Sequence, residues 1–460
     1  DRDWSSDVCS SDLTSTRSVQ RSGERVSSVR CDMIPTSQHC CAADERRHAL
    51  VADRRTYASA RVPHREVTTA VVREVRRGAM TAGYHRRNHL KLRADAEVDG
   101  RGDERARRER VNERKVDGGA ADLATMDLDT LVAATDAAIL ALLAEWEEPL
   151  TAPMYAQVRY HMGYEDPNAR PGKRMRPLLG LLAYSALAPD WERALPGAVA
   201  VELGHNFSLM HDDIEDGDRE RRGRPTLWVR DGVAQAINTG DALFTVSRVA
   251  LHKLTALGFS DARVIRLMKL YDETCLRLCE GQFIDIAASA KSEMQSVEHY
   301  FEMIGRKTAA LISGSVESGA ILATDDEETI ERFRTFGWAL GLAFQINDDL
   351  LGIWGDEAAT GKEPSDLARH KKTLPVLYAV EKASGEDLAT ITRLYATDAP
   401  DDGLVAAGLA VLERLGARTY TREQAALWRK RAIAEIRAVS ALNPHAITRL
   451  EEIIAKVISA

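Results

Sequence analysis

The stretch Asp212-Asp213-Ile214-Glu215-Asp216 ends an apolar run, residues 198–210, that has the composition of a buried helix. On a helix, Asp212 and Asp216 share a face and Asp213 lies close to them, so their carboxylates converge. Converging like charges are costly beside apolar surface unless cations neutralise them. Oxygen ligands suit Mg²⁺, which usually binds one or two carboxylates together with substrate phosphates. An isolated acidic cluster is more often a solvated helix end, so the rest of the chain decides between these interpretations.

Charge is unevenly distributed along the 460 residues. Residues 1–125 carry 25 Lys and Arg against 20 Asp and Glu, whereas residues 126–460 carry 37 against 50. The front segment is poor in Leu, Ile and Phe and has no sustained helical or strand period, so it cannot bury enough apolar surface to offset its ordering entropy. Its opening residues, Trp4 to Leu13, resemble a translated sequencing-adapter peptide. We therefore expect residues 1–125 to be disordered or artefactual, and the natural protein to begin at Met126.

Neither nucleic acid nor membrane is expected as a partner. The Arg-rich run 101–115 alternates basic with acidic residues and has no interleaved aromatic residues to stack on bases. No apolar stretch approaches the ~20 residues that cross a bilayer. Four of the six cysteines lie in the front segment, and Cys275 and Cys279 are too few for a disulfide framework. We therefore expect a cytoplasmic protein.

The pattern of residues 126–460 predicts one all-α domain with ten or more helices around a single core. Runs 233–257, 260–288 and 404–414 have helical spacing, and we find no set of alternating segments that would form a sheet. Two apolar stripes with helical steps are Leu131, Ala134, Ala138 and Leu142, and Phe333, Gly337, Leu340 and Phe344.

Two basic segments flank the acidic helix. Lys173, Arg174 and Arg176 lead into a helix for which Pro177 suits the first position, and a helix N-terminus already favours anions. The run 219–226 adds four arginines just after the acidic stretch. An arginine guanidinium can form two parallel hydrogen bonds to the oxygens of one phosphate. Metal-binding acids would supply the other half of a diphosphate site. Each segment alone would be an ordinary surface loop, and their proximity to the acids favours the functional interpretation.

Two further segments place polar groups on predicted helices. Gln282 and Asp285 share a face within the run 260–288, and Lys307 and Thr308 precede a helix rich in small residues. A point charge with a hydroxyl can bind one end of a diphosphate, although a helix-start lysine is equally common. His205 lies about two turns before the acidic cluster on the same face, as a polar group in a cavity wall would.

The sequence FQINDD forms a second acidic centre that ends in Asp348 and Asp349. Gln345 and Asp349 share a helix face, with Asp348 beside them. Lys362 and Lys371 follow. Two acidic helices that face each other across a bundle can hold a metal cluster between them.

The ordered set GKRMRP, HDDIED, RRGRPT, GQFID, GRKTA, FQINDD and HKKTLP resembles the trans-isoprenyl diphosphate synthases, the polyprenyl synthetase family, over about residues 150 to 380. The resemblance implies an isoprenoid synthase helical bundle around a central cavity, normally a homodimer, with a catalytic domain over residues 126–460. It also implies Mg²⁺-dependent head-to-tail condensation of isopentenyl diphosphate with an allylic diphosphate, with release of diphosphate.

The same resemblance implies roles for individual residues. A Mg²⁺ cluster, of three ions when substrate is bound, would be held by Asp212, Asp213, Asp216, Asp348 and Asp349. The allylic substrate would contact Arg221, Lys307, Thr308, Gln345, Lys362 and Lys371. Isopentenyl diphosphate would contact Lys173, Arg176, His205 and Arg222. The residues expected to be catalytic are Asp212, Asp213, Asp216, Arg221, Lys307 and Lys362.

Product length is expected to depend on Phe207 and Ser208, the fifth and fourth residues before the first acidic motif. A large Phe207 beside a small Ser208 resembles the geranylgeranyl type, with the farnesyl type next, so we expect a C15–C20 product with C20 favoured. One position departs from the family pattern, because Gly352 stands where many relatives carry a third acid. Asp356 is a candidate substitute.

Three other functions share some of these features. A class I terpene cyclase also uses DDxxD, but its second motif requires a Ser or Thr at position 352 and a Glu at position 356, and it would have no use for GKRMRP. A metal-dependent HD-type phosphohydrolase could use His211 and Asp212 but needs further His ligands. A non-catalytic regulatory subunit of a prenyl synthase would not require the intact metal and cation motifs.

Overall fold

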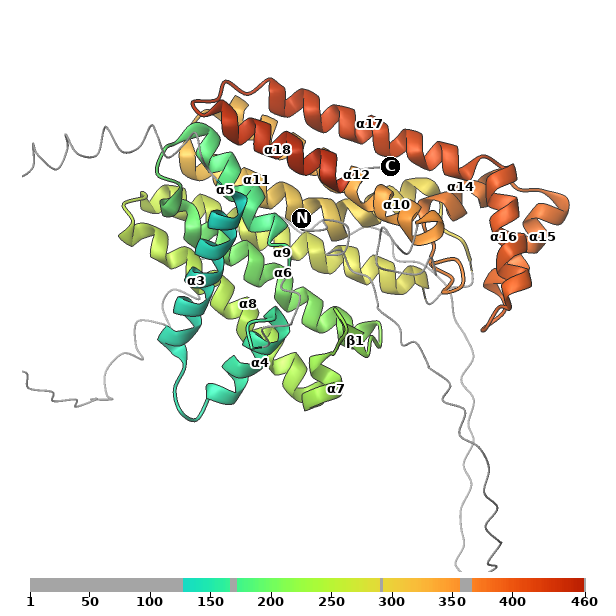
Figure 1. Ribbon diagram of the computed structural model, residues 1–460, viewed down its shortest axis with the longest axis horizontal. Helices are drawn as coiled ribbons and strands as arrows, with labels where there is room; N and C mark the ends of the chain where they lie inside the picture. Colours follow the sequence, from blue (N-terminus) through green and yellow to red (C-terminus); the bar gives the residue numbers. More distant parts are fainter. Residues whose placement is uncertain (1–126, 166–171, 290–292, 356–365, 459–460) are drawn as a thin grey trace, which may run out of the picture. The chain divides into compact units, whose positions relative to one another are not determined.

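The computed structural model describes residues 127–165, 172–289, 293–355 and 366–458. In these ranges the chain is helical apart from loops and one pairing of two-residue strands (Figure 1). The elements are α3 (Leu128–Trp146), α4 (Ala152–Met162), α5 (Met175–Leu187), η1 (Trp191–Ala194), α6 (Leu195–Glu215), β1 (Glu220–Arg221), β2 (Arg224–Pro225), α7 (Leu227–Asp231), α8 (Val233–Ala256), α9 (Asp261–Ser289), α10 (Val297–Ile304), η2 (Gly305–Ala309), α11 (Ala310–Ala323), α12 (Glu327–Trp354), α14 (Leu374–Lys382), α15 (Gly385–Tyr395), α16 (Asp402–Arg414), α17 (Ala417–Arg437) and α18 (Pro444–Val457).

The all-α fold expected from the sequence is confirmed. The predicted runs 233–257, 260–288 and 404–414 correspond to α8, α9 and α16. The expected single core is instead one large hydrophobic cluster with two smaller ones, which lie around α10 and α14 and around α15 and α16. Residues 1–125 and Lys362 lie outside the described residues.

The two acidic motifs lie on α6 and α12, which are held in different layers of the bundle. α6 packs mainly against α8, and α12 packs against α17, which runs along it (Figure 1). α11 lies between α5 and α12 and also contacts α6. The helices that carry the acidic motifs are therefore joined through α11.

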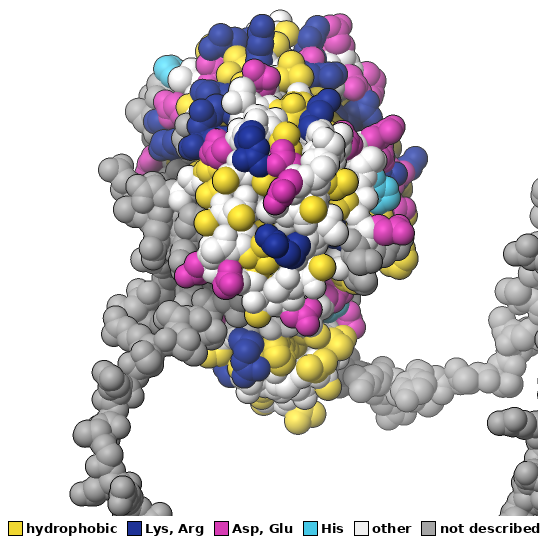
Figure 2. Space-filling view, turned by 90° about the vertical axis from the view of Figure 1, so that its right-hand side faces the viewer, with side chains coloured by type: hydrophobic (Ala, Val, Ile, Leu, Met, Phe, Trp, Pro, Cys, Tyr) yellow, Lys and Arg dark blue, Asp and Glu magenta, His cyan; other side chains and the backbone are white. Residues whose placement is uncertain are grey.

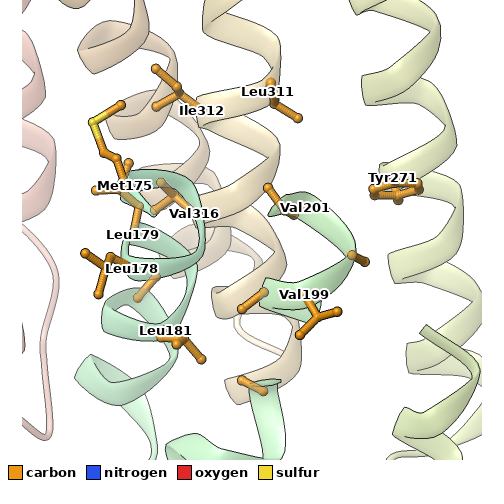
Figure 3. Close-up of a cluster of buried hydrophobic side chains, with 14 of the residues drawn as sticks. Met175, Leu178, Leu179, Leu181, Val199, Val201, Tyr271, Leu311, Ile312 and Val316 are labelled. Carbon is orange, nitrogen blue, oxygen red and sulfur yellow. The ribbon is translucent and has the colours of Figure 1, made fainter. Parts of the chain in front are cut away.

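Helices α5 and α11 approach closely because small residues face each other. A Cβ atom on Gly319 would collide with the carbonyl oxygen of Gly180, so the two backbones are in contact there. Buried side chains close the space around this contact (Figure 3). They include Leu178 and Leu179 of α5 and Val316 of α11.

Pro177 lies in the first turn of α5 but not at its first position, because the helix begins at Met175 with Arg174 as its N-cap. Our sequence prediction was therefore displaced by two residues. The helix tolerates Pro177 there because the first four N–H groups of a helix have no intrahelical acceptor.

The surface at the α15 and α16 end of the molecule mixes charges of both signs. Figure 2 shows Lys and Arg side chains interspersed with Asp and Glu over the upper part of this face. The visible side chains of this face therefore form no stripe of a single charge sign. Among the helices of the described ranges, none has the length and apolar character needed to cross a membrane.

Candidate active site

The first acidic motif occupies the C-terminal end of α6. Asp212 and Asp213 are 6% and 1% exposed, and Asp216 is the exposed C-cap residue. A helix C-terminus carries the negative end of the helix dipole, so acids are destabilising there without nearby cations. Burial raises the pKa of Asp213 to about 7, although Arg221, whose Nε donates to its Oδ1 at 2.7 Å, opposes this shift. This end of α6 therefore favours bound cations.

Helix α9 and the π-helical turn η2 bring a lysine to the same region. Lys307 on η2 forms an ion pair of 2.5 Å with Asp285 of α9, and Gln282 Nε2 donates to Glu215 Oε2 of α6 at 2.8 Å. The contact requires Gly281, because a Cβ atom there would collide with the backbone of Lys307. Single π-turns within helices are frequent at functional sites.

The two acids of the second motif have different surroundings. Asp348 is half-buried, whereas Asp349 is 4% exposed. Asp349 Oδ2 accepts hydrogen bonds from Tyr300 Oη at 2.6 Å and from the Leu374 N–H at 2.9 Å, and its Oδ1 accepts one from Gln345 Nε2 at 3.2 Å. Burial raises the pKa of Asp349 to about 6, opposed by these hydrogen bonds. Asp349 therefore accepts three hydrogen bonds from the protein, two of them on Oδ2.

Gln345 links this helix to η2, because its Oε1 accepts a hydrogen bond from Thr308 Oγ1 at 2.9 Å. Thr308 is buried next to Lys307. Thr308 and Gln345, two of the six residues expected to contact the allylic substrate, thus lie side by side on different elements.

The charge of Lys371 acts on both acidic motifs. Burial alone would lower its pKa, but its ion pair with Asp366 at 3.0 Å and the charge of Asp348 raise it above its ordinary value. Burial raises the pKa of Asp216, and Lys307 and Lys371 oppose that rise. Printed contacts aside from charge link the two motifs through η2, because Thr308 binds Gln345 of the second motif and Lys307 binds Asp285 of α9, whose Gln282 binds Glu215 of the first. Lys371 lies at the second motif through Asp366, which packs against Gly352.

A residue that our sequence analysis missed lies at the end of the second motif. The Asp366 N–H donates to the Gly352 carbonyl at 3.2 Å, and a Cβ atom on Gly352 would collide with the Asp366 carboxylate. Asp366 therefore fills the space that a side chain at position 352 would occupy. Our earlier candidate, Asp356, lies outside the described residues. The pairing of Asp366 with Gly352 follows no helical spacing, so the sequence offered no signal for it.

The two basic segments meet at Gly172. A Cβ atom on Gly172 would lie 2.8 Å from an Arg174 guanidinium nitrogen and 3.0 Å from one of Arg222. Arg174 and Arg222 both adopt left-handed backbone conformations, with φ of 52° and 53°. Such conformations are strained for residues other than glycine and cluster at functional sites. Lys173 lies between Gly172 and Arg174 and is partly buried.

His205 lies among these arginines. It is 6% exposed, and burial together with the charges of Arg176 and Arg222 lowers its pKa well below the ordinary value. It is therefore a neutral imidazole. Arg176 and Arg222, two of the residues expected to contact isopentenyl diphosphate, therefore act electrostatically on a third, His205.

The two residues expected to set product length lie on different faces of α6. Ser208 is one turn from Asp212 on the same face, and its Oγ donates to the His205 carbonyl at 2.8 Å. Phe207 faces α8 instead, where its ring lies 4.8 Å from that of Phe244.

Tyr271 of α9 packs against Gly204 of α6, two turns before Asp212, and the sequence analysis did not single it out. Its side chain points from α9 toward α6 (Figure 3) and its hydroxyl lies 2.6 Å from Ser247 Oγ. A Cβ atom on Gly204 would collide with this hydroxyl, so only glycine leaves space for it. Tyr271 also lines a small cavity of about 10 Å³ together with Val201 and Gly197.

The carboxylates suit Mg²⁺ when it is shared with a ligand. Among the described residues, no three Asp, Glu, His or Cys side chains are placed to hold a metal ion by themselves. All acids at the site are oxygen donors, and Asp213 Oδ2 is buried without a hydrogen bond from the described part of the chain. Oxygen donors in small number, completed by substrate phosphates, are typical of Mg²⁺ sites rather than of transition-metal sites.

Comparison with known proteins identifies relatives of this chain. Residues 162–412 match the family described as polyprenyl synthetase. The chain is 41% identical to the geranylgeranyl diphosphate synthase of Mycobacterium tuberculosis, over 54% of this chain and 71% of that protein. It is 37% identical to the (2E,6E)-farnesyl diphosphate synthase of Mycobacterium bovis, over 62% of this chain and 80% of that protein. The crystal structure of geranylgeranyl pyrophosphate synthetase from Pyrococcus horikoshii is similar with a TM-score of 0.65 and 32% identity, covering 72% of this chain and 96% of that chain.

Proposed function

We propose that this chain, which belongs to the polyprenyl synthetase family, uses Mg²⁺ and makes a C15–C20 prenyl diphosphate, with C20 favoured. As a member of that family it is a prenyltransferase that joins isopentenyl diphosphate to an allylic diphosphate. The observation that carries the proposal is the position of η2 between the two acidic motifs: Thr308 binds Gln345 of the second motif, and Lys307 binds Asp285 of α9, whose Gln282 binds Glu215 of the first. A diphosphate in the region between the motifs would meet lysines and metal-binding carboxylates together.

The chain's own cations would stabilise the departing diphosphate. Lys307 and Lys371 are held by Asp285 and Asp366, so both charges are positioned before substrate binds. Arg221 is fixed in the same way by Asp213. Positioned charges in a site with little water stabilise developing negative charge without reorganisation.

Asp212, Asp213, Asp216 and Asp348 would hold Mg²⁺, which when bound neutralises charge on the leaving diphosphate. We assign Asp349 to positioning, since its hydrogen bonds hold Tyr300 and the start of α14. Asp366 joins the site by holding Lys371.

Lys173, Arg176 and Arg222 would hold isopentenyl diphosphate beside neutral His205. The double bond of isopentenyl diphosphate would attack the allylic carbocation head-to-tail, and a proton would then pass to the released diphosphate. This scheme requires no nucleophilic side chain, and the described cysteines agree with that: burial raises the pKa of Cys275 to about 12 and also raises that of Cys279.

The test is to incubate the protein with isopentenyl diphosphate, Mg²⁺ and dimethylallyl, geranyl or farnesyl diphosphate, and then to measure product length. We expect a C20 product that is lost when Mg²⁺ is chelated and restored when it is added back. A cyclic hydrocarbon formed from the allylic substrate alone would support a terpene cyclase instead.

Product length should depend on Tyr271 as well as on Phe207. Replacing Tyr271 with alanine removes a ring that lines the cavity beside Val201 and opens space next to Gly204 of α6. We expect products at least one isoprene unit longer, and a similar result for Phe207→Ala. Chromatography of the dephosphorylated alcohols measures the change.

Tyr271→Phe is the matched control, because it keeps the ring and loses only the hydroxyl that contacts Ser247. It should leave product length unchanged. An unchanged product from Tyr271→Ala would show that Tyr271 does not limit product length.

We also propose a cytoplasmic homodimer. Ile265, Leu276 and Phe283 on α9 are 65%, 61% and 74% exposed, and spacings of 11 and 7 residues place them on one face. An exposed apolar stripe of this kind favours a protein partner, and a second copy is the partner that the family relationship implies. Cys275 and Cys279 are free thiols, as expected in a reducing compartment.

Leu276→Glu is expected to convert the dimer to monomers, because it places a charge in the apolar stripe. Light scattering coupled to size-exclusion chromatography measures the mass. Leu150→Glu is the matched control, since Leu150 is 92% exposed and lies outside the stripe, and it should remain dimeric. A Leu276→Glu dimer would show that copies associate through another face.

A further inference from the structure

Arg174 lies within the basic segment but its guanidinium is engaged by the protein. The side chain is fully buried. Its Nε donates to Asp136 Oδ1 at 2.6 Å, its Nη1 to Glu202 Oε1 at 3.1 Å and its Nη2 to the Met162 carbonyl at 3.3 Å. The two acids raise its pKa further, against the opposing effect of burial. All three donor nitrogens of Arg174 therefore bind protein acceptors.

The partners of Arg174 come from separate elements. Asp136 lies on α3 and also accepts a hydrogen bond from Tyr164 Oη at 2.8 Å. Glu202 lies on α6 and also accepts one from Asn206 Nδ2 at 3.0 Å. The guanidinium therefore fixes the lead-in to α5 against both α3 and the helix that carries the first acidic motif.

The backbone at Arg174 is strained, and the network compensates for the strain. A left-handed conformation is unfavourable for a residue that carries a Cβ atom. Arg174 is also the N-cap of α5, so this turn sets the direction of Lys173 before it and Arg176 after it. Gly172 packs against the guanidinium groups of both Arg174 and Arg222, so the position of Arg222 depends on the same turn.

We propose that the buried Asp136–Arg174–Glu202 network positions Lys173, Arg176 and Arg222 for the diphosphate of isopentenyl diphosphate. The proposal rests on the function proposed above and adds a positioning role for residues that do not contact the substrate. Asp136 lies on α3, before residue 162, where the family match begins. The proposal therefore gives α3 a role in positioning the residues that bind substrate.

The test compares Arg174→Met and Arg174→Lys with the unmodified protein in steady-state kinetics with each substrate varied in turn. For Arg174→Met we expect the KM for isopentenyl diphosphate to rise about tenfold or more, and the KM for the allylic substrate to change less than about twofold. Arg174→Lys keeps the charge but cannot bind Asp136 and Glu202 together, so it should recover part of the loss. Asp136→Ala should shift the same KM in the same direction by less.

The matched control is Arg263→Met. Arg263 also joins two elements, because it donates to the Leu322 carbonyl at 2.7 Å and pairs with Asp325 at 2.5 Å, but it belongs to neither basic segment. It should lower thermal stability without changing either KM. If Arg174→Met does not fold because it leaves Glu202 buried without its counter-ion, Arg174→Met combined with Glu202→Gln removes both charges.

Equal changes in both KM values, or changes no larger than those of Arg263→Met, would overturn the positioning role. A protein that condenses no isopentenyl diphosphate at all would instead overturn the proposed function. The two failures are therefore distinguishable.

Discussion

Replacing Asp212 with alanine is expected to reduce condensation by about 1,000-fold or more while leaving the fold intact. Asp212 is buried in the last turn of α6, one turn from Asp216. Loss of one positioned group that stabilises transition-state charge typically costs a factor of 100 to 1,000, and a group that also holds metal should reach the upper end. Product formation from radiolabelled isopentenyl diphosphate measures the rate.

The stability of this variant is a second readout. Removing one of several acids at the negative end of a helix dipole reduces repulsion, so the melting temperature should stay the same or rise. Asp241→Ala is the matched control, because the Asp241 side chain is 69% exposed on the neighbouring α8 and should matter to neither quantity. Near-normal turnover in Asp212→Ala would contradict the assignment of α6 as the metal-binding helix.

Asp348 and Asp349 are expected to differ sharply although they are adjacent. Asp349→Ala should lower the free energy of unfolding by about 2–4 kcal/mol, because it leaves the buried Tyr300 hydroxyl and the Leu374 N–H without acceptors. Urea denaturation measures this change. Asp349→Asn keeps one acceptor oxygen and should lose less.

Asp348→Ala should show the opposite pattern, with unfolding unchanged and kcat reduced about 100-fold, since Asp348 is half-buried beside Lys371. The pair of variants is its own control, because both delete the same carboxylate from the same helix. If Asp349→Ala proved stable and inactive while Asp348→Ala proved active, the two roles would have to be exchanged.

The spacing of residues a few positions apart in the sequence was enough to predict many of the helices. Helical periods placed α8, α9 and α16 nearly at their observed bounds, because an amphipathic stripe depends only on residues a few positions apart. The proximity of Asp212 to Asp216 follows from one helical turn in the same way. The family resemblance then suggested the functional groups, and the structure brings Thr308 together with Gln345, and Arg176 with His205 and Arg222.

What the sequence determined by itself is the helical class, the order of the motifs and the local grouping of charges. Only the tertiary structure decided that Asp349 binds Tyr300 and that Asp366 fills the space beside Gly352. It also decided that Tyr271 packs against Gly204 and that the buried Arg174 forms ion pairs with Asp136 and Glu202. In each case the partners lie far apart in the chain, so their contact depends on how whole helices pack and not on any local period.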